Sequence, residues 1–163
     1  MNTKQLVEAI QTILRAAVWP TTGENVFADE SVIITSAAPE EVYESYRSPQ
    51  VHIGIGGMQA DPDSHPRLIS QEIPVRLVVI NANDGAGEGA LVGAHRVANT
   101  SRNAGLLEIE EELMDSINLL SGDEGISILC RSSSATKAAM LSDGRYCVVR
   151  DYNFTARITT ITS

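Results

Sequence analysis

Two long stretches of alternating apolar and polar residues constrain the fold of this chain more than any other feature. Apolar residues fall mainly at odd positions over residues 69–79 and at even positions over residues 146–158. A period of two residues is typical of a strand with one buried face. Arg150 interrupts the second stretch, and Pro74, which has no N–H to donate, indicates a sheet edge or a bulge in the first. We therefore expect two long strands that each turn one apolar face toward a core.

Two other segments repeat apolar residues at helical spacing. The first begins with Thr3 as its expected N-cap and ends before Pro20, and its apolar face consists of Leu6, Ile10, Ile13, Leu14 and Ala17. The apolar face of the second, over residues 106–120, consists of Leu106, Ile109, Leu113, Ile117 and Leu120. The glutamates of residues 108–112 are expected to form the solvated face of this second helix.

The order of these elements predicts the fold class. Shorter strand patterns occupy residues 31–39, 51–57 and 126–132, and long flexible loops are expected over residues 57–68 and 82–104. A chain of 163 residues, of which 43% are hydrophobic, fits one domain spanning residues 1–163. Helix, strands, helix and strands in this order predict an α+β fold, with a single layer of helices packed on a mixed, mostly antiparallel sheet of four to five strands.

The charge of the chain argues against several classes of partner. The formal net charge is −9, and only Lys4 and Lys137 are lysines. Nucleic-acid binding requires a dense cationic surface, and anionic lipid attracts the same kind of surface, so neither is an expected partner. Cys130 and Cys147 lie in strand-like runs and are expected to be reduced, buried thiols.

A glycine-rich segment offers the most tempting functional motif. Gly85, Gly87 and Ala90 fit the G-x-G-x-x-[GA] pattern of dinucleotide-binding loops. Asp84 and Glu88 would place carboxylates where a pyrophosphate carries its charge, and four residues separate the strand from the first glycine. We favour a loop whose glycines supply backbone freedom, and we retain a small nucleotide-binding enzyme using residues 85–90 as a less favoured alternative.

Metal and catalytic motifs are also weak. Asp61, Asp63 and Glu72 match positions one, three and twelve of a calcium-binding EF-hand loop, but Pro66 replaces the glycine at position six. The three histidines show no metal-ligand spacing, and no serine lies in a nucleophile motif. The prediction is therefore a protein that is not an enzyme, with no catalytic, cofactor-binding or metal site and no cofactor.

The whole-chain pattern carries a family resemblance. An amphipathic helix and an early strand precede the long strand "IPVRLVVIN", the acidic helix "LLEIEEELMDSINLL" and a closing pair of strands that ends in "VVRDYNFTARI". This order resembles the tail terminator, or tail completion, proteins of long-tailed bacteriophages. The resemblance rests on element order, and the segment over residues 82–104 departs from it as an apparent insertion.

The resemblance implies a structural role in the virion. It implies a homo-oligomeric ring, with six subunits, that caps the tail tube and meets the head-side connector protein. DNA would only pass through the channel, where an acidic wall repels phosphate. The implied location is the tail or neck of the virion, after assembly in the host cytoplasm, with no membrane involved. Alternatives are another head-tail connector, a tail tube subunit, or a protein-binding domain of a bacterial host.

The subunit contacts of such a ring are expected in the polar loops and on the exposed side of the helix over residues 106–120. Loops that order on assembly supply contacts of this kind. The candidate contact residues are Asp61, Asp63, His65, Arg67, Asp84, Glu88, Arg96 and Arg102.

Overall fold

The chain has an α+β fold, seen in a computed structural model that describes residues 1–36, 47–61, 63, 67–80, 88–93, 104–122, 126–141 and 144–160. The described helices are α1 (Thr3–Arg15), α3 (Glu88–Val92) and α4 (Leu106–Leu120), with a short 3-10 turn, η1 (Asp29–Ser31). The strands are β1 (Val32–Ile34), β2 (Gln50–Ile53), β3 (Met58–Asp61), β4 (Arg67–Val79), β5 (Ile126–Ser133), β6 (Lys137–Met140) and β7 (Tyr146–Thr160).

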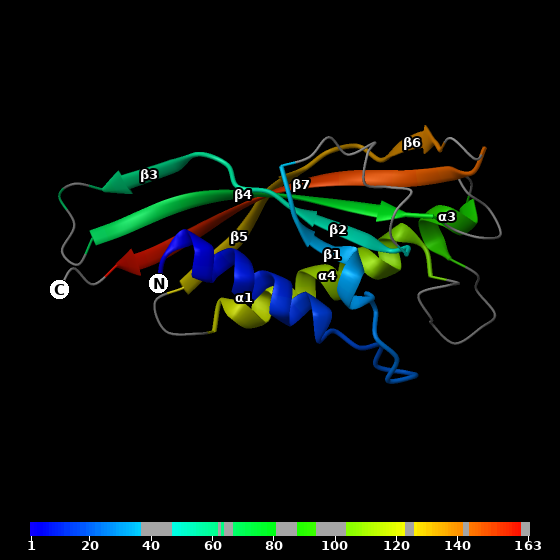
Figure 1. Cartoon of the computed structure of the whole chain (residues 1–163), viewed down its shortest axis with the longest axis horizontal. Coiled ribbons are helices and arrows are strands. Elements are labelled where there is room, and N and C mark those ends of the chain that lie inside the picture. The colour runs from blue at the N-terminus through cyan, green and yellow to red at the C-terminus, as the bar shows by residue number, and fades with distance from the viewer. Residues whose placement is uncertain are drawn as a thin grey trace.

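The seven strands form one mixed sheet whose centre is the pairing of β4 with β7. The order is β1-β2-β4-β7-β5, while β3 pairs with β4 and β6 pairs with β7. Only β1 and β2 run parallel among the described pairs. Every residue of β4 has a partner in β7, from Arg67↔Thr160 to Val79↔Val148. This ladder is about 40 Å long at the usual rise per strand residue, so it forms the long axis of the molecule in Figure 1.

The expected count of four to five strands is too low, because two long strands are each interrupted. On the outer side of β4, the register shifts by one residue between β2 and β3. On the outer side of β7, it shifts once within β5, between Cys130 and Ser132, and again before β6. Each interruption is a short irregular segment in a strand that otherwise continues along its neighbour. Such breaks depend on the matching of two strands, which the residue pattern of one strand does not reveal.

The break between β2 and β3 explains how Pro74 can stand in a central strand. Gly56 N–H donates to Glu72 O (2.8 Å), and Glu72 N–H donates to Gly57 O (2.9 Å), so two residues oppose one in a β-bulge. A Cβ on Gly56 would lie 2.9 Å from the Glu72 Cβ, so this close approach requires glycine. The sequence predicted an edge or a bulge at Pro74, and the structure has a bulge two residues away, opposite Glu72.

Helices α1 and α4 pack side by side beneath the sheet in the view of Figure 1. Their apolar faces join the inward side chains of β4 and β7 in the main core. Asn2, rather than the predicted Thr3, caps α1: its side chain accepts from Gln5 N–H (2.9 Å) while Gln5 Oε1 accepts from Asn2 N–H (2.9 Å). The Thr3 hydroxyl instead donates to Gln71 Oε1 (3.1 Å), which ties α1 to β4.

The predicted apolar faces are confirmed with few exceptions. All five residues of the α4 stripe are buried, as are the odd positions of β4 from Gln71 to Val79 and most even positions of β7. Among the predicted apolar positions of β7, Tyr146 is exposed. It lies at the end of the strand, where it pairs with β6 and lies beyond the ladder with β4, which reaches only Val148. The helical and strand periods therefore identified most of the main core.

Two segments predicted as long loops contain regular structure. Residues 58–61 form β3, and β4 begins at Arg67. The two segments are ordered because β3 pairs antiparallel with the N-terminal half of β4. Residues 88–92 form α3, whose Ala90 is fully buried in the core. The remaining parts of the two predicted loops, apart from residues 57, 63, 93 and 104, lie outside the described residues.

A second, smaller apolar cluster lies on the other face of the sheet. It joins Val78, Leu141, Cys147 and Val149. Cys147 is buried as predicted, and burial raises the pKa of its thiol. Cys130 is free but exposed, which corrects the prediction of two buried thiols. Cys130 lies in β5, which is the last strand of the sheet order. The side chains of an edge strand are less covered than those of the central strand β7.

Candidate functional site

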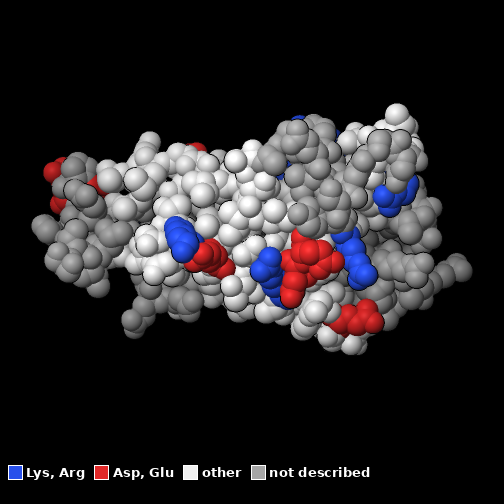
Figure 2. All heavy atoms as spheres, in the orientation of Figure 1, with Lys and Arg blue, Asp and Glu red and all other residues white. Residues whose placement is uncertain are grey.

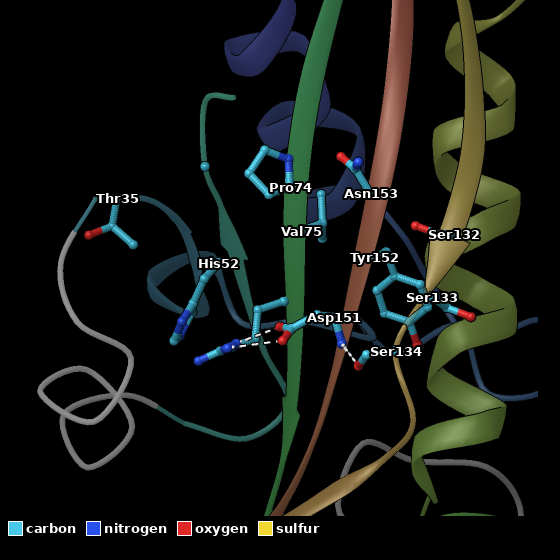
Figure 3. A pocket seen from close by; sticks show the side chains of 12 residues that line it. Thr35, His52, Pro74, Val75, Ser132, Ser133, Ser134, Asp151, Tyr152 and Asn153 are labelled. Atoms are coloured by element: carbon cyan, nitrogen blue, oxygen red, sulfur yellow. Dashed lines mark hydrogen bonds and ion pairs between the residues drawn. The ribbon is translucent and has the colours of Figure 1, made fainter. Parts of the chain in front are cut away.

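A groove of about 540 Å³ crosses the sheet at its centre, and most of the residues that line it have polar side chains. The contributing elements are β2, β4, β5 and β7, together with Thr35 just after β1, and they are far apart in the sequence (Figure 3). Its lining residues include Thr35, His52, Arg76, Ser132, Ser133, Ser134, Asp151 and Asn153. Register explains the gathering, because His52 pairs with Arg76 and Arg76 pairs with Asp151, and paired residues share a face.

A bidentate ion pair forms the floor of the groove. Arg76 Nε lies 2.5 Å from Asp151 Oδ1, and Arg76 Nη2 lies 3.0 Å from Asp151 Oδ2 (Figure 3). Both side chains are partly screened from water. Fork-to-carboxylate pairing is geometrically specific and neutralises both charges. The pair therefore links β4 to β7. The charges of the two side chains cancel, so together they add no net charge to the groove.

His52 is the buried titratable group beside this pair. The residue is 7% exposed, and its Nε2 lies 3.0 Å from Gln50 Oε1. Burial and then the Arg76 charge lower the pKa of His52 from 6.5 to about 4, while Asp151 opposes the shift. His52 is consequently neutral at pH 7.

The serines of the groove hold the junction between β5 and β6. Ser134 Oγ accepts from Asp151 N–H (3.0 Å) and donates to Ala135 O (2.9 Å), and Ser133 Oγ accepts from Arg150 Nη2 (3.0 Å). A nucleophilic serine needs a base within hydrogen-bond reach. The contacts of Ser133 and Ser134 instead fix the backbone where the strand is interrupted.

The pKa of His52 predicts an acid-sensitive fold. Its folded pKa of about 4 lies below the unfolded value of 6.5, so the unfolded chain binds the proton first as the pH falls. The free energy of unfolding should therefore drop through this window, with about 3 kcal/mol lost to His52 between pH 7.5 and pH 4. Urea unfolding at a series of pH values measures the loss.

His52→Gln provides the comparison, because it removes the titrating ring while retaining a polar side chain. The carboxylates titrate in both proteins, so the difference between the two pH profiles isolates His52. The difference should change by about 3 kcal/mol between pH 7.5 and pH 4 and level off below that pH. Parallel profiles across the whole range would contradict the assignment.

The structure describes only part of the predicted contact set. Asp61 and Asp63 lie in and just after β3, both exposed, and Asp63 N–H donates to Asp61 Oδ1 (3.1 Å). Arg67 begins β4 and Glu88 begins α3, but their side chains are not described. The other predicted contact residues, His65, Asp84, Arg96 and Arg102, lie outside the described residues. None of the described candidates lines the groove.

The sequence prediction missed a polar cluster beneath the sheet. Glu110 Oε1 accepts from Tyr152 OH (2.6 Å) and from Arg150 Nη1 (2.8 Å), and Arg150 Nε donates to Ser134 O (3.0 Å). Burial, and next the hydrogen bond to Glu110, raise the pKa of Tyr152. Glu110 is therefore not part of a fully solvated helix face, which corrects the prediction for residues 108–112. The available signal was Arg150, a lone cation in an apolar strand face.

Two of the outer strand edges each carry a side-chain contact at one residue. The Val32 carbonyl in β1 accepts from Gln11 Nε2 (2.9 Å) and Arg15 Nη2 (3.3 Å) of α1. In β5, Ile128 N–H donates to Ser121 Oγ (2.9 Å), whose hydroxyl donates back to Ile128 O (3.1 Å). Such contacts satisfy edge groups that would otherwise invite another strand.

Charge on the visible surface is mixed rather than cationic. Figure 2 shows acidic and basic groups close together along the lower side of the molecule. Lys4 Nζ lies 3.5 Å from Glu8, and Arg47 Nε lies 3.9 Å from Glu30. This face therefore offers no continuous cationic surface for phosphates.

The described residues contain neither a metal-binding cluster nor a membrane-spanning helix, and known protein sequences give no match. Across the described ranges, no three His, Cys, Asp or Glu side chains are grouped so that they could hold a metal ion. No helix in the part of the chain that the structure describes is both long and apolar enough to span a bilayer. Comparison with models of protein families finds no match, and neither does a search of curated protein sequences.

Proposed function

We propose that this chain is a self-assembling structural subunit that forms a ring, with six copies as the expected number. In this proposal the ring caps the tail tube of a long-tailed bacteriophage and joins it to the head-side connector. One layer of helices on one face of the sheet, with the groove on the opposite face, is the subunit architecture that the proposal uses. The phage assignment rests on the resemblance in element order, and self-assembly rests on the surface described next.

Exposed apolar side chains at the two ends of the sheet carry the proposal of self-assembly. Met58, at the start of β3, is 56% exposed, and Ile55, in the break between β2 and β3 opposite the middle of β4, is 59% exposed. At the other end, where β6 meets β7, Met140 is 67% exposed and Tyr146 is 45% exposed. We take these exposed side chains, on the two outer sides of the sheet, as parts of the surface that a neighbouring copy covers.

Two further features support a channel-forming assembly. The net charge of −9 would disfavour DNA binding to a wall that DNA must slide past. The long β4–β7 ladder supplies a stiff element along the whole subunit. In the proposed ring this ladder would connect the contact surface on one side of the subunit with the contact surface on the other side.

Light scattering and electron microscopy of the purified chain test the proposal. The expected particle is a closed ring of uniform mass, with six subunits. A tail tube subunit would instead stack into filaments, which distinguishes the main alternative within the same class. Because concentration drives assembly, the mass should be measured up to millimolar chain. A monodisperse monomer at that concentration, which also fails to bind tail tubes, would contradict the proposal.

The enzyme alternative has its own test. Isothermal titration with ATP and NAD should show no binding by the wild-type chain. If binding were found and persisted in Gly87→Val, the site would lie elsewhere than the glycine segment. Binding that this substitution abolished would favour the nucleotide-binding alternative over the structural role.

A further inference from the structure

Strands β3 and β6 differ from the other edges of the sheet. Each is four residues long and has one strand partner among the described residues, β4 for β3 and β7 for β6. All of β3 and three of the four residues of β6 are exposed. The edges of β1 and β5 carry the side-chain contacts described above, so β3 and β6 are the edges best placed to accept a further strand.

The backbone of β3 presents alternate residues outward. Glu72 N–H in β4 donates to Gly57 O (2.9 Å), which fixes the phase of the ladder. In an antiparallel pair the residues that exchange hydrogen bonds alternate with those that do not. Gln59 and Asp61 therefore face β4, and the backbone groups of Met58 and Ala60 point to the outer edge.

The same reasoning applies to β6. Leu141 N–H donates to Arg145 O (2.7 Å) at the turn into β7. Alternation then directs Ala139 and Lys137 toward β7, and the backbone groups of Ala138 and Met140 to the outer edge.

The two edges match when set antiparallel. With Met58 opposite Met140, Ala60 lies opposite Ala138, so both outward-facing pairs can exchange backbone hydrogen bonds. The same register places Asp61 opposite Lys137, an acidic group against a basic one. Apolar and opposite-charge cross-strand pairs are each stabilising. A shift by one residue would lose all three matches.

The faces of the sheet match as well. Met58 pairs with Gln71, which contacts α1 through Thr3, so the Met58 side chain projects on the helix side. Met140 pairs with Tyr146, which shares its face with the core residue Val148. Joining the two edges therefore leaves the helices of both subunits on the same side of a continuous sheet.

We propose that β3 of one subunit adds to β6 of the next subunit, in the register that sets Met58 against Met140 and Asp61 against Lys137. The partner is a second copy of this chain, and the pairing rests on the ring-forming function proposed above. The two edges differ, so the contact is head-to-tail, and its repetition builds a ring when the rotation from one copy to the next closes. Each subunit contributes one edge to each neighbour, which gives every copy the same two contacts.

Disulfide trapping tests the register. Ala60→Cys with Ala138→Cys, in a Cys130→Ser background, places two small thiols on a hydrogen-bonded pair whose expected Cα separation of about 5.5 Å suits a disulfide. Mild oxidation should give a ladder of covalent oligomers that reductant returns to monomer. Each single variant should stay monomeric on a denaturing gel, because Cys147 is buried. Dimers from a single variant would show an edge paired with its own copy and would overturn the proposal.

A matched control addresses the neighbouring edge. Ala60→Cys with Ser127→Cys, in the same background, places the second thiol on β5, where the edge is covered at Ile128. This variant should not form the ladder, and a ladder here in place of the first would overturn the proposed partner strand. If the wild-type chain forms rings but Ala60→Cys/Ala138→Cys does not cross-link, the pairing fails while the ring function stands. A wild-type chain that remains monomeric defeats both.

Charge exchange supplies a second readout. Asp61→Lys sets two cations opposite each other, and Lys137→Asp sets two anions opposite each other. Each variant alone should need roughly tenfold more protein to assemble, because the favourable cross-strand pair becomes repulsive. An equimolar mixture of the two restores an opposite-charge pair at every contact of an alternating ring, so assembly should recover. Failure of the mixture to assemble better than either variant would count against the register.

Discussion

Gly105→Ala is expected to lower the free energy of unfolding by about 3 kcal/mol or more, one of the two largest effects that we predict for a substitution in this chain. A Cβ at this position would lie 2.6 Å from the Leu91 carbonyl carbon and still closer to Gly93 N. These are backbone atoms at the end of α3, so no side-chain rotation relieves the clash. Chemical denaturation in urea measures the change.

Two other glycines serve as controls for Gly105. A Cβ on Gly122 would make only an ordinary contact, 3.5 Å from Leu119 O, so Gly122→Ala should change stability by less than about 0.5 kcal/mol. Gly23 has open space but a φ of +72°, so Gly23→Ala should cost about 1 kcal/mol through backbone conformation alone. Equal losses at the three positions would contradict the close approach of α3 and α4.

Glu110→Ala is expected to give the second large effect, a loss of about 2–3 kcal/mol in the free energy of unfolding. The carboxylate holds both the Tyr152 hydroxyl and the Arg150 guanidinium from the opposite element. Its removal leaves a charged group and a buried hydroxyl without this acceptor. Because both side chains of the ion pair are largely shielded from water, solvent screening only partly reduces the effect.

Glu111→Ala on the same helix is the matched control, since Glu111 is exposed and should lose less than about 0.5 kcal/mol. A double-mutant cycle with Tyr152→Phe separates the hydroxyl contact from the loss of the carboxylate. The two substitutions should be non-additive by about 1 kcal/mol. Additive losses would mean that Glu110 and Tyr152 act independently, contrary to the 2.6 Å contact.

Elements with strong internal periodicity could be predicted from the sequence. The stripe on α4, the inward positions of β4 and most of those of β7 followed from spacing alone, because a buried face must repeat with the period of its own helix or strand. The N-cap of α1 was placed one residue late, since Asn2 and Thr3 are both good capping residues. Only the hydrogen bonds with Gln5 distinguish them.

The groove could not be found in the same way. His52, Arg76 and Asp151 come from three strands and meet only because the register aligns them. A residue pattern predicts which face a side chain takes, but not which residue of another strand lies beside it. The contact residues predicted from the loops therefore include none of the groove residues.

The sequence by itself determined the α+β class and the inward faces of α1, α4, β4 and most of β7, because these depend on spacing within one segment. Tertiary structure alone decided that two long strands break into four, that Glu110 reaches Arg150 forty residues away, and that side chains bond to the edges of β1 and β5 at Val32 and Ile128. It also decided which edges remain for a neighbour. The physical reason is that bulges, edge contacts and ion pairs depend on how distant segments match, and no single segment encodes that match.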